Sequence, residues 1–164
     1  MTHQPITLFF FSGTGNTWWV GERIAEALNT RGAPTELLSI EGLPRAEVEQ
    51  KVAASDVIGI GYPIYASDAP LLMQQFIADL PPQNTPKDLL VYITQMGWSG
   101  NGAYFLHRTL EKKGYRLRWA VEFNMPNNIG IHYFPAYSTP DYETFAPVLQ
   151  TARQRAETLA DCMV

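Results

Sequence analysis

The chain has 164 residues, a length that suits one domain with a hydrophobic core. Its net charge of −4 argues against nucleic-acid binding, which needs a basic surface. No apolar stretch is long enough to span a bilayer and the N-terminus lacks signal-peptide features, so we expect a cytoplasmic protein with no membrane span. The single cysteine, Cys162, excludes an iron–sulfur cluster held by four cysteines within this chain.

The first predicted strand, residues 6–11, is almost continuously apolar, which is typical of a strand buried on both faces of a parallel sheet. It ends in a short loop, Ser12-Gly13-Thr14-Gly15-Asn16-Thr17, and a helix is predicted from about 16 to 30. A loop between a strand and a helix N-terminus directs backbone N–H groups toward an anion, and the three hydroxyls of this loop add donors. The loop contains no Lys or Arg, so the pattern predicts a phosphate site made of neutral donors.

Two common phosphate loops are excluded by spacing. A P-loop needs Lys followed by Ser or Thr after its last Gly, and here Asn16 and Thr17 follow Gly15. The dinucleotide fingerprint G-x-G-x-x-G needs a third Gly where Trp18 stands. The loop therefore indicates a monophosphate site, and a tight turn without a ligand is the alternative interpretation.

The rest of the chain alternates between predicted strands and helices. Strands are expected at 34–40, 56–61, 89–96 and 117–125, and helices at 44–54, after Pro70, at 104–113 and from Pro140 onward. Alternating strands and helices imply a single α/β domain, residues 1–164, with helices on both faces of a five-stranded parallel sheet. The strand order 2-1-3-4-5 is expected, since it places the ends of strands 1, 3 and 4 together.

Three details of the helices are also predicted. The helix after Pro70 is expected to bury an apolar set, and Thr139 is expected to cap the last helix. That apolar set consists of Leu71, Leu72, Phe76 and Leu80. Trp19 is expected on the exposed side of its helix, packed against a neighbouring loop or contacting a protein partner.

Two aromatic loops are expected beside the phosphate loop. The strand 56–61 runs into Tyr62-Pro63-Ile64-Tyr65, and the strand 89–96 ends in a Gly-rich loop that contains Trp98. Flat aromatic side chains on two neighbouring loops suit a planar ring such as an isoalloxazine, which gains from stacking. Asp68 has two interpretations: it caps the following helix, or its carboxylate faces the ring.

The motif S-G-T-G-N-T after an apolar strand resembles the phosphate loop of flavodoxin-like FMN proteins. The closest resemblance is to the flavodoxin domain of the family that is often fused to a bacterial-type ferredoxin. The segment 62–65 followed by Pro70, and the segment 124–128, resemble the same family. The resemblance implies a flavodoxin-like three-layer sandwich and FMN as the cofactor.

The resemblance also implies roles for individual residues. It assigns the phosphate to Ser12, Gly13, Thr14, Gly15, Asn16 and Thr17. It assigns one side and edge of the ring to Pro63, Ile64, Tyr65 and Ala66. It assigns the other side and the pyrimidine edge to Met96, Gly97, Trp98, Gly100, Asn101 and Gly102.

An electron-transfer flavoprotein is the function that the resemblance implies, with a redox partner such as a ferredoxin or a reductase. Two alternatives stay open: an FMN-dependent reductase of a quinone-type small molecule, and a flavin-free interaction domain. A signalling receiver is excluded because strand 1 ends in Phe11 and Ser12, without the carboxylates that such a site needs. No catalytic triad or metal-ligand cluster is evident in the sequence.

Overall fold

A computed structural model describes residues 5–65, 68–98, 100, 102–104, 106–127 and 141–164. The elements in chain order are β1 (Ile6–Phe10), α1 (Asn16–Thr30), β2 (Thr35–Ser39), α2 (Arg45–Ala54), β3 (Val57–Pro63), α3 (Leu71–Asp79), β4 (Lys87–Gln95), the 3₁₀ turn η1 (Gly102–Tyr104), α4 (His107–Lys112), β5 (Tyr115–Asn124) and α5 (Tyr142–Met163). The five strands are parallel in the order β2-β1-β3-β4-β5, which confirms the predicted fold class and strand order.

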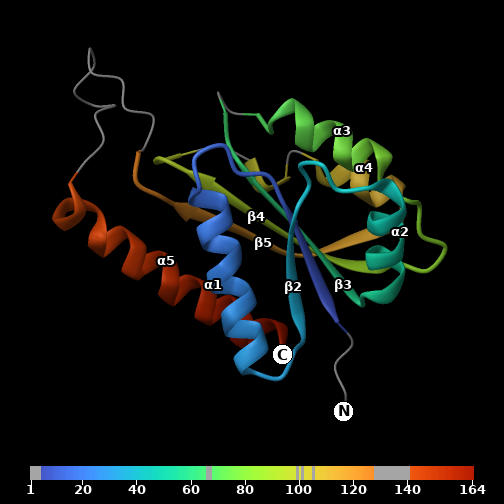
Figure 1. The fold of residues 1–164 in the computed structure, drawn as a ribbon, viewed down its shortest axis with the longest axis horizontal. Coiled ribbons are helices and arrows are strands. Elements are labelled where there is room, and N and C mark those ends of the chain that lie inside the picture. Colours follow the sequence, from blue (N-terminus) through green and yellow to red (C-terminus); the bar gives the residue numbers. More distant parts are fainter. Residues whose placement is uncertain (1–4, 66–67, 99, 101, 105, 128–140) are drawn as a thin grey trace.

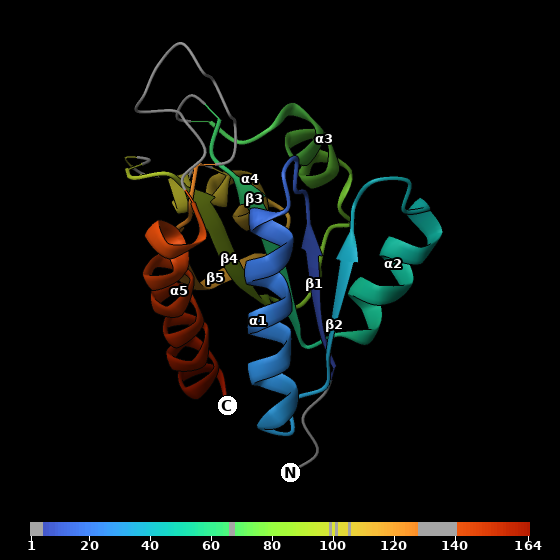
Figure 2. The same cartoon turned by 60° about the vertical axis from the view of Figure 1, so that its left-hand side comes forward.

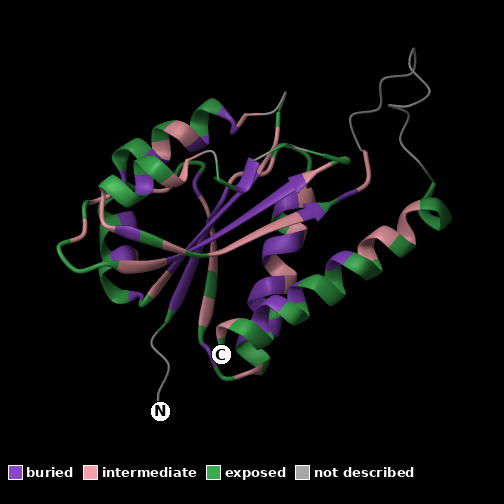
Figure 3. Cartoon of the chain, turned by 180° about the vertical axis from the view of Figure 1, so that it is seen from behind, coloured by how far each residue is buried: buried purple, intermediate pink, exposed green. Residues whose placement is uncertain are grey.

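Helices cover both faces of the sheet. Figures 1 and 2 show α1 and α5 on one face and α2, α3 and α4 on the other. All five residues of β1 are buried; Leu8 packs into the cluster with α1 and α5, while Phe9 packs into the opposite cluster. The continuous apolar run of β1 therefore reflects a strand that is covered from both sides. The buried layer of strands between the helices is visible in Figure 3.

The edge strand β5 contains an irregularity in its pairing with β4. Leu89 pairs with Leu117, but the next residue, Leu90, pairs with Trp119, so Arg118 is an extra residue in β5. An inserted residue changes which side chains face each side of a strand. Leu117 accordingly packs toward α4, and Trp119 packs toward α5.

The predicted apolar set of α3 is confirmed for Leu80, which is buried, and for Phe76, which packs partly buried against the core, but it is wrong for Leu71 and Leu72. Met73, Ile77 and Leu80 are buried, whereas Leu71 is 68% exposed and Leu72 is 41% exposed. Met73, Ile77 and Leu80 are spaced by four and three residues, so they share the face that packs on the sheet. Pro70 occupies the cap position, which places Leu71 and Leu72 in a first turn whose outer side faces solvent.

The predicted cap of α5 is also corrected. Asp141 is the N-cap residue, and its carboxylate accepts hydrogen bonds of 2.8 Å from the Thr144 N–H and 2.7 Å from the Thr144 hydroxyl. These bonds lower the pKa of Asp141, because they stabilise the charged form. Thr139 and Pro140 lie outside the described residues.

Trp19 is half-buried rather than exposed. It packs against the cluster between α1 and α5, and the Arg23 guanidinium lies 5.6 Å from its ring centre. The exposed indole is that of Trp18, which is 48% exposed. One residue along a helix turns the side chain by about 100°, so Trp18 and Trp19 point in different directions.

Tyr92 in β4 carries a buried hydroxyl for which the described residues provide no hydrogen-bond partner. Burial raises the pKa of Tyr92, so the phenol stays neutral. We expect Tyr92→Phe to increase the free energy of unfolding by about 1 kcal/mol, since an unpaired polar atom is removed from the core. Urea denaturation measures this change; a loss of stability of the same size would mean that the hydroxyl is hydrogen-bonded, for example to a buried water.

Candidate functional site

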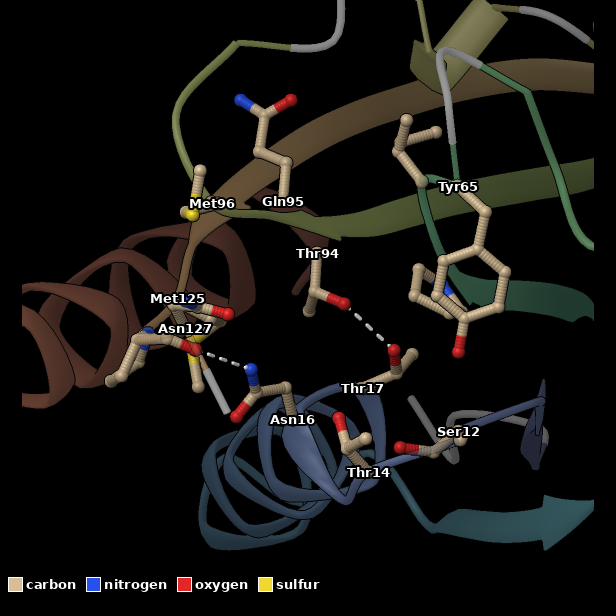
Figure 4. A pocket seen from close by; sticks show the side chains of 14 residues that line it. Ser12, Thr14, Asn16, Thr17, Tyr65, Thr94, Gln95, Met96, Met125 and Asn127 are labelled. Atoms are coloured by element: carbon tan, nitrogen blue, oxygen red, sulfur yellow. Dashed lines mark hydrogen bonds between the residues drawn. The ribbon is translucent and has the colours of Figure 1, made fainter. Parts of the chain in front are cut away.

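A hollow of about 310 Å³ lies at the carboxyl edge of the sheet, where β1, β3, β4 and β5 end (Figure 4). Its lining consists of Ser12, Gly13, Thr14, Asn16, Thr17, Pro63, Ile64, Tyr65, Thr94, Gln95, Met96, Met125, Pro126 and Asn127. None of these residues has an ionisable acidic or basic side chain other than the phenol of Tyr65. The part of the site that the described residues form is therefore neutral at ordinary pH and is lined by hydroxyls, amides and apolar side chains.

The loop after β1 leads into the N-terminus of α1. Gly15 is the N-cap residue and has a φ of 95°, a left-handed conformation that is costly for residues with a side chain. The Ser12 Oγ accepts a hydrogen bond of 3.1 Å from the Gly15 N–H, which closes the turn. The first intrahelical bond joins the Trp19 N–H to the Gly15 carbonyl, so the N–H groups that precede it in the first turn are oriented to bind an anion.

Two hydrogen bonds tie this loop to neighbouring strand ends. Asn16 Nδ2 donates to the Pro126 carbonyl at 2.9 Å, and the hydroxyls of Thr17 and Thr94 share a hydrogen bond of 2.7 Å. Thr17 and Thr94 are both buried, at the base of the hollow (Figure 4). The ends of β1, β4 and β5 are thereby held in one arrangement around the site.

Tyr65, two residues beyond the end of β3, lies against the loop between β1 and α1. A Cβ atom at position 13 would lie 2.3 Å from the Tyr65 hydroxyl, so glycine is needed for this contact. Burial raises the pKa of the Tyr65 phenol. Tyr65 and Asp68 also exchange backbone hydrogen bonds of 2.9 and 3.0 Å, which hold these two residues side by side at this corner of the hollow.

Asp68 does not cap α3. Its Oδ1 accepts a hydrogen bond of 2.7 Å from the adjacent Ala69 N–H, and α3 has no side-chain cap. The capping interpretation is therefore wrong, and the carboxylate is used within its own turn. Ala66 lies outside the described residues, so its role at the ring stays a prediction.

The loop after β4 contributes less to the hollow than we expected. Met96 lines it, whereas Gly97, Gly100 and Gly102 do not, and Trp98 is 86% exposed. Gly15 is likewise absent from this lining. Asn101 lies outside the described residues, and its predicted contact with a ring stays a prediction, as do those of the other residues in this loop.

Tyr62 is a core residue that anchors the same loop. It is fully buried, and its hydroxyl donates a hydrogen bond of 2.9 Å to the Gly102 carbonyl. We expect Tyr62→Phe to lower the free energy of unfolding by about 1–2 kcal/mol, because a buried carbonyl loses its partner. Urea denaturation of Tyr62→Phe and Tyr92→Phe side by side is the matched comparison. Each variant loses one phenol oxygen, and the expected changes in the free energy of unfolding have opposite signs. An unchanged stability would contradict the anchoring role.

Five lining residues were not among the predicted site residues: Thr94, Gln95, Met125, Pro126 and Asn127. The last three belong to the segment after strand 5 that carries part of the family resemblance, so a signal for them was present. Gln95 is oriented by bonds from its Nε2 to Glu122 Oε2 at 3.2 Å and to Asn124 Oδ1 at 3.0 Å. The sequence around Thr94 and Gln95 is typical of a strand and does not indicate a site. Only the tertiary structure places these two residues at the hollow.

Two features are absent from the described residues. No helix in that part of the chain is long and apolar enough to cross a membrane. No group of three or more His, Cys, Asp or Glu side chains in it is arranged to hold a metal ion.

Comparison with known proteins gives one curated relative and several similar structures, while no protein-family model matches the chain. The relative, named as a diflavin flavoprotein A 2 from Thermosynechococcus vestitus, is 28% identical over 112 residues. The match covers 68% of this chain but only 19% of that protein, so the chain spans about a fifth of the relative's length.

The similar structures include flavodoxins and a domain of a larger oxidoreductase. A flavodoxin from the domain Archaea has a TM-score of 0.61 and 15% identity, covering 96% of each chain. The Megasphaera elsdenii flavodoxin has a TM-score of 0.62 and 22% identity, covering 92% of this chain and 98% of that one. The rubredoxin oxygen:oxidoreductase of Desulfovibrio gigas has a TM-score of 0.64 and 16% identity, covering 96% of this chain and 37% of that one. The chain therefore has the flavodoxin-like fold.

Proposed function

We propose that the chain binds FMN in the hollow at the carboxyl edge of the sheet and carries electrons between redox partners. The observation that supports this most strongly is the convergence of the phosphate loop, the Pro63–Tyr65 segment and the end of β4 on one neutral hollow. The names of the curated relative and of the similar flavodoxins agree with a flavin-dependent redox role.

The residues of the hollow fit the parts of FMN. The hydroxyls of Ser12 and Thr14 and the first-turn N–H groups of α1 would hold the phosphate. Pro63, Ile64 and Tyr65 would form one wall of the ring site. Met96 and Met125 offer soft, polarisable side chains on the opposite wall, as Figure 4 shows. A volume of about 310 Å³ is within the range of small-molecule sites.

The bound flavin would supply the redox chemistry by accepting and releasing electrons. This chain's own residues would bind the phosphate, set the ring's orientation and shield one side of it from water. Exposed apolar side chains beside the hollow, those of Tyr65, Met96 and Trp98, would then meet a redox partner. A ferredoxin or a reductase is the class of partner that we propose.

The test of the proposal begins with the flavin content of the purified chain. We expect a yellow protein with one FMN per chain, released by heat denaturation and rebound by the refolded protein. Colourless protein that does not bind added FMN would contradict the proposal and favour an interaction domain.

A second assay separates the carrier from the reductase. Reduced holoprotein should pass electrons to an oxidised ferredoxin or cytochrome faster than to a quinone at equal concentration. Faster multiple turnover of the quinone would favour the small-molecule reductase instead.

A further inference from the structure

A second hollow, of about 320 Å³, adjoins the first at the N-terminus of α1. Asn16, Met125, Pro126 and Asn127 line both hollows. The hydrogen bond from Asn16 to the Pro126 carbonyl is part of this shared wall. The remaining lining of the second hollow is Gly15, Trp18, Trp19, Phe145 and Leu149.

The described lining of the second hollow is aromatic and includes no charged side chain. Trp18 and Trp19 come from α1, and Phe145 and Leu149 come from the first turns of α5. Trp18 is 48% exposed, which is unusual for an indole unless a ligand or partner covers it. Two indoles and a phenyl ring without a charged neighbour in the lining suit a flat, uncharged aromatic ring that can stack.

The phosphate loop connects the two hollows. Trp18 is the third residue of α1, so its backbone N–H belongs to the first turn that would bind an anion, while its side chain lines the second hollow. Gly15, at the cap, lines the second hollow, and no atom of the described residues lies within 4 Å of the place where its Cβ would be. A group attached to the outer side of a phosphate on this loop would therefore enter the hollow that the indole of Trp18 also lines.

We propose that the second hollow binds an adenine ring joined to the flavin through a diphosphate, so that the chain accepts FAD as well as FMN. The proposal rests on the proposed function, because it requires a flavin in the first hollow. The adenine would stack on Trp18, and the diphosphate would replace the monophosphate at the first turn of α1. Trp18, which takes the place of the third Gly in a dinucleotide fingerprint, would serve as the stacking surface for the second nucleotide.

The experiment titrates FMN and FAD into flavin-free protein and measures the dissociation constants by flavin fluorescence. We expect the FAD constant to lie within threefold of the FMN constant or below it. Trp18→Ala should weaken FAD binding about tenfold, the effect of losing one base–aromatic stack, and leave FMN binding within twofold. Trp18→Phe should keep most of the FAD affinity, since it retains an aromatic face.

Tyr104→Ala is the matched control, because Tyr104 is exposed to the same extent as Trp18, 48%, and lines neither hollow. It should leave both constants unchanged. FAD binding more than tenfold weaker than FMN binding in the unmodified chain, or an equal loss for both flavins in Trp18→Ala, would overturn the inference and leave the proposed function standing. Failure of both flavins to bind would overturn the proposed function and the inference together.

Discussion

Thr14→Asp is expected to weaken FMN binding by at least 100-fold while leaving the affinity for riboflavin within threefold. Thr14 lines the hollow within a loop whose donors are neutral, so the substitution places a carboxylate beside the phosphate. Two unit charges 4 Å apart repel by about 4 kcal/mol at an effective dielectric constant of 20. If solvent screening halves this energy for each charge pair, the two charges of the phosphate together still give a repulsion of about 4 kcal/mol. That repulsion exceeds the roughly 2.8 kcal/mol that corresponds to a 100-fold change in affinity. Riboflavin has no phosphate and is not subject to this repulsion.

The matched control is Thr14→Asn, which has nearly the same shape as aspartate but no charge. It should lower FMN affinity no more than tenfold, the cost of one lost hydroxyl donor. Fluorescence titrations of both variants with both flavins give the four constants required. If Thr14→Asp weakened the binding of riboflavin as much as that of FMN, charge repulsion of the phosphate would not be the cause. The substitution would then have disrupted the loop, or the phosphate would lie elsewhere. A thermal melt of each variant identifies such general loss of structure.

The strand order and the short loop between β1 and α1 could be predicted from local patterns in the sequence. The continuous apolar run of β1, followed by small residues and a helical pattern, needs no knowledge of the rest of the chain. The alternation of strands and helices then leaves few topologies for a parallel sheet. The structure confirms α1 at 16–30 with the boundaries that the pattern predicted.

The remaining features depend on contacts between distant residues. The bond between Thr17 and Thr94 joins positions 77 apart in the sequence, and neither residue type indicates that partner. The extra residue Arg118 in β5 is visible only in the pairing with β4. Leu71 and Leu72 are hydrophobic yet exposed, because the direction in which α3 leaves Pro70 decides which face meets the sheet.

The exposure of aromatic side chains also depends on the tertiary structure and could not be predicted from the sequence. Trp98 is 86% exposed and is not in the described lining of the hollow, so its predicted contact with a ring stays a prediction. An aromatic residue in a Gly-rich loop at a strand end predicts a position near the site. It does not predict the direction in which the side chain points. Trp18 and Trp19 show how one position on a helix separates an exposed indole from one packed in the core.

Gly61→Ala is expected to lower the free energy of unfolding by about 3 kcal/mol, at the upper end of what overpacking of a core costs. Gly61 in β3 pairs with Tyr92 in β4, and an added Cβ would lie 2.0 Å from the Tyr92 Cζ. Tyr92 cannot move aside easily, because its hydroxyl already lies 2.6 Å from where a Cβ of Gly21 in α1 would be. The ring is therefore confined between the sheet and α1.

The matched control is Gly97→Ala, since no atom of the described residues lies within 4 Å of the added Cβ and the backbone there is not in the left-handed region. Its stability should change by less than about 0.5 kcal/mol. In a double-mutant cycle, Tyr92→Leu removes the ring that the added Cβ would strike, so Gly61→Ala should cost at least about 1 kcal/mol less in that background than in the original chain. Equal costs in the two backgrounds would show that the clash is not with Tyr92.

β3 carries Pro63–Tyr65 to the hollow, so the same substitution should also weaken FMN binding in proportion to the displacement of that strand.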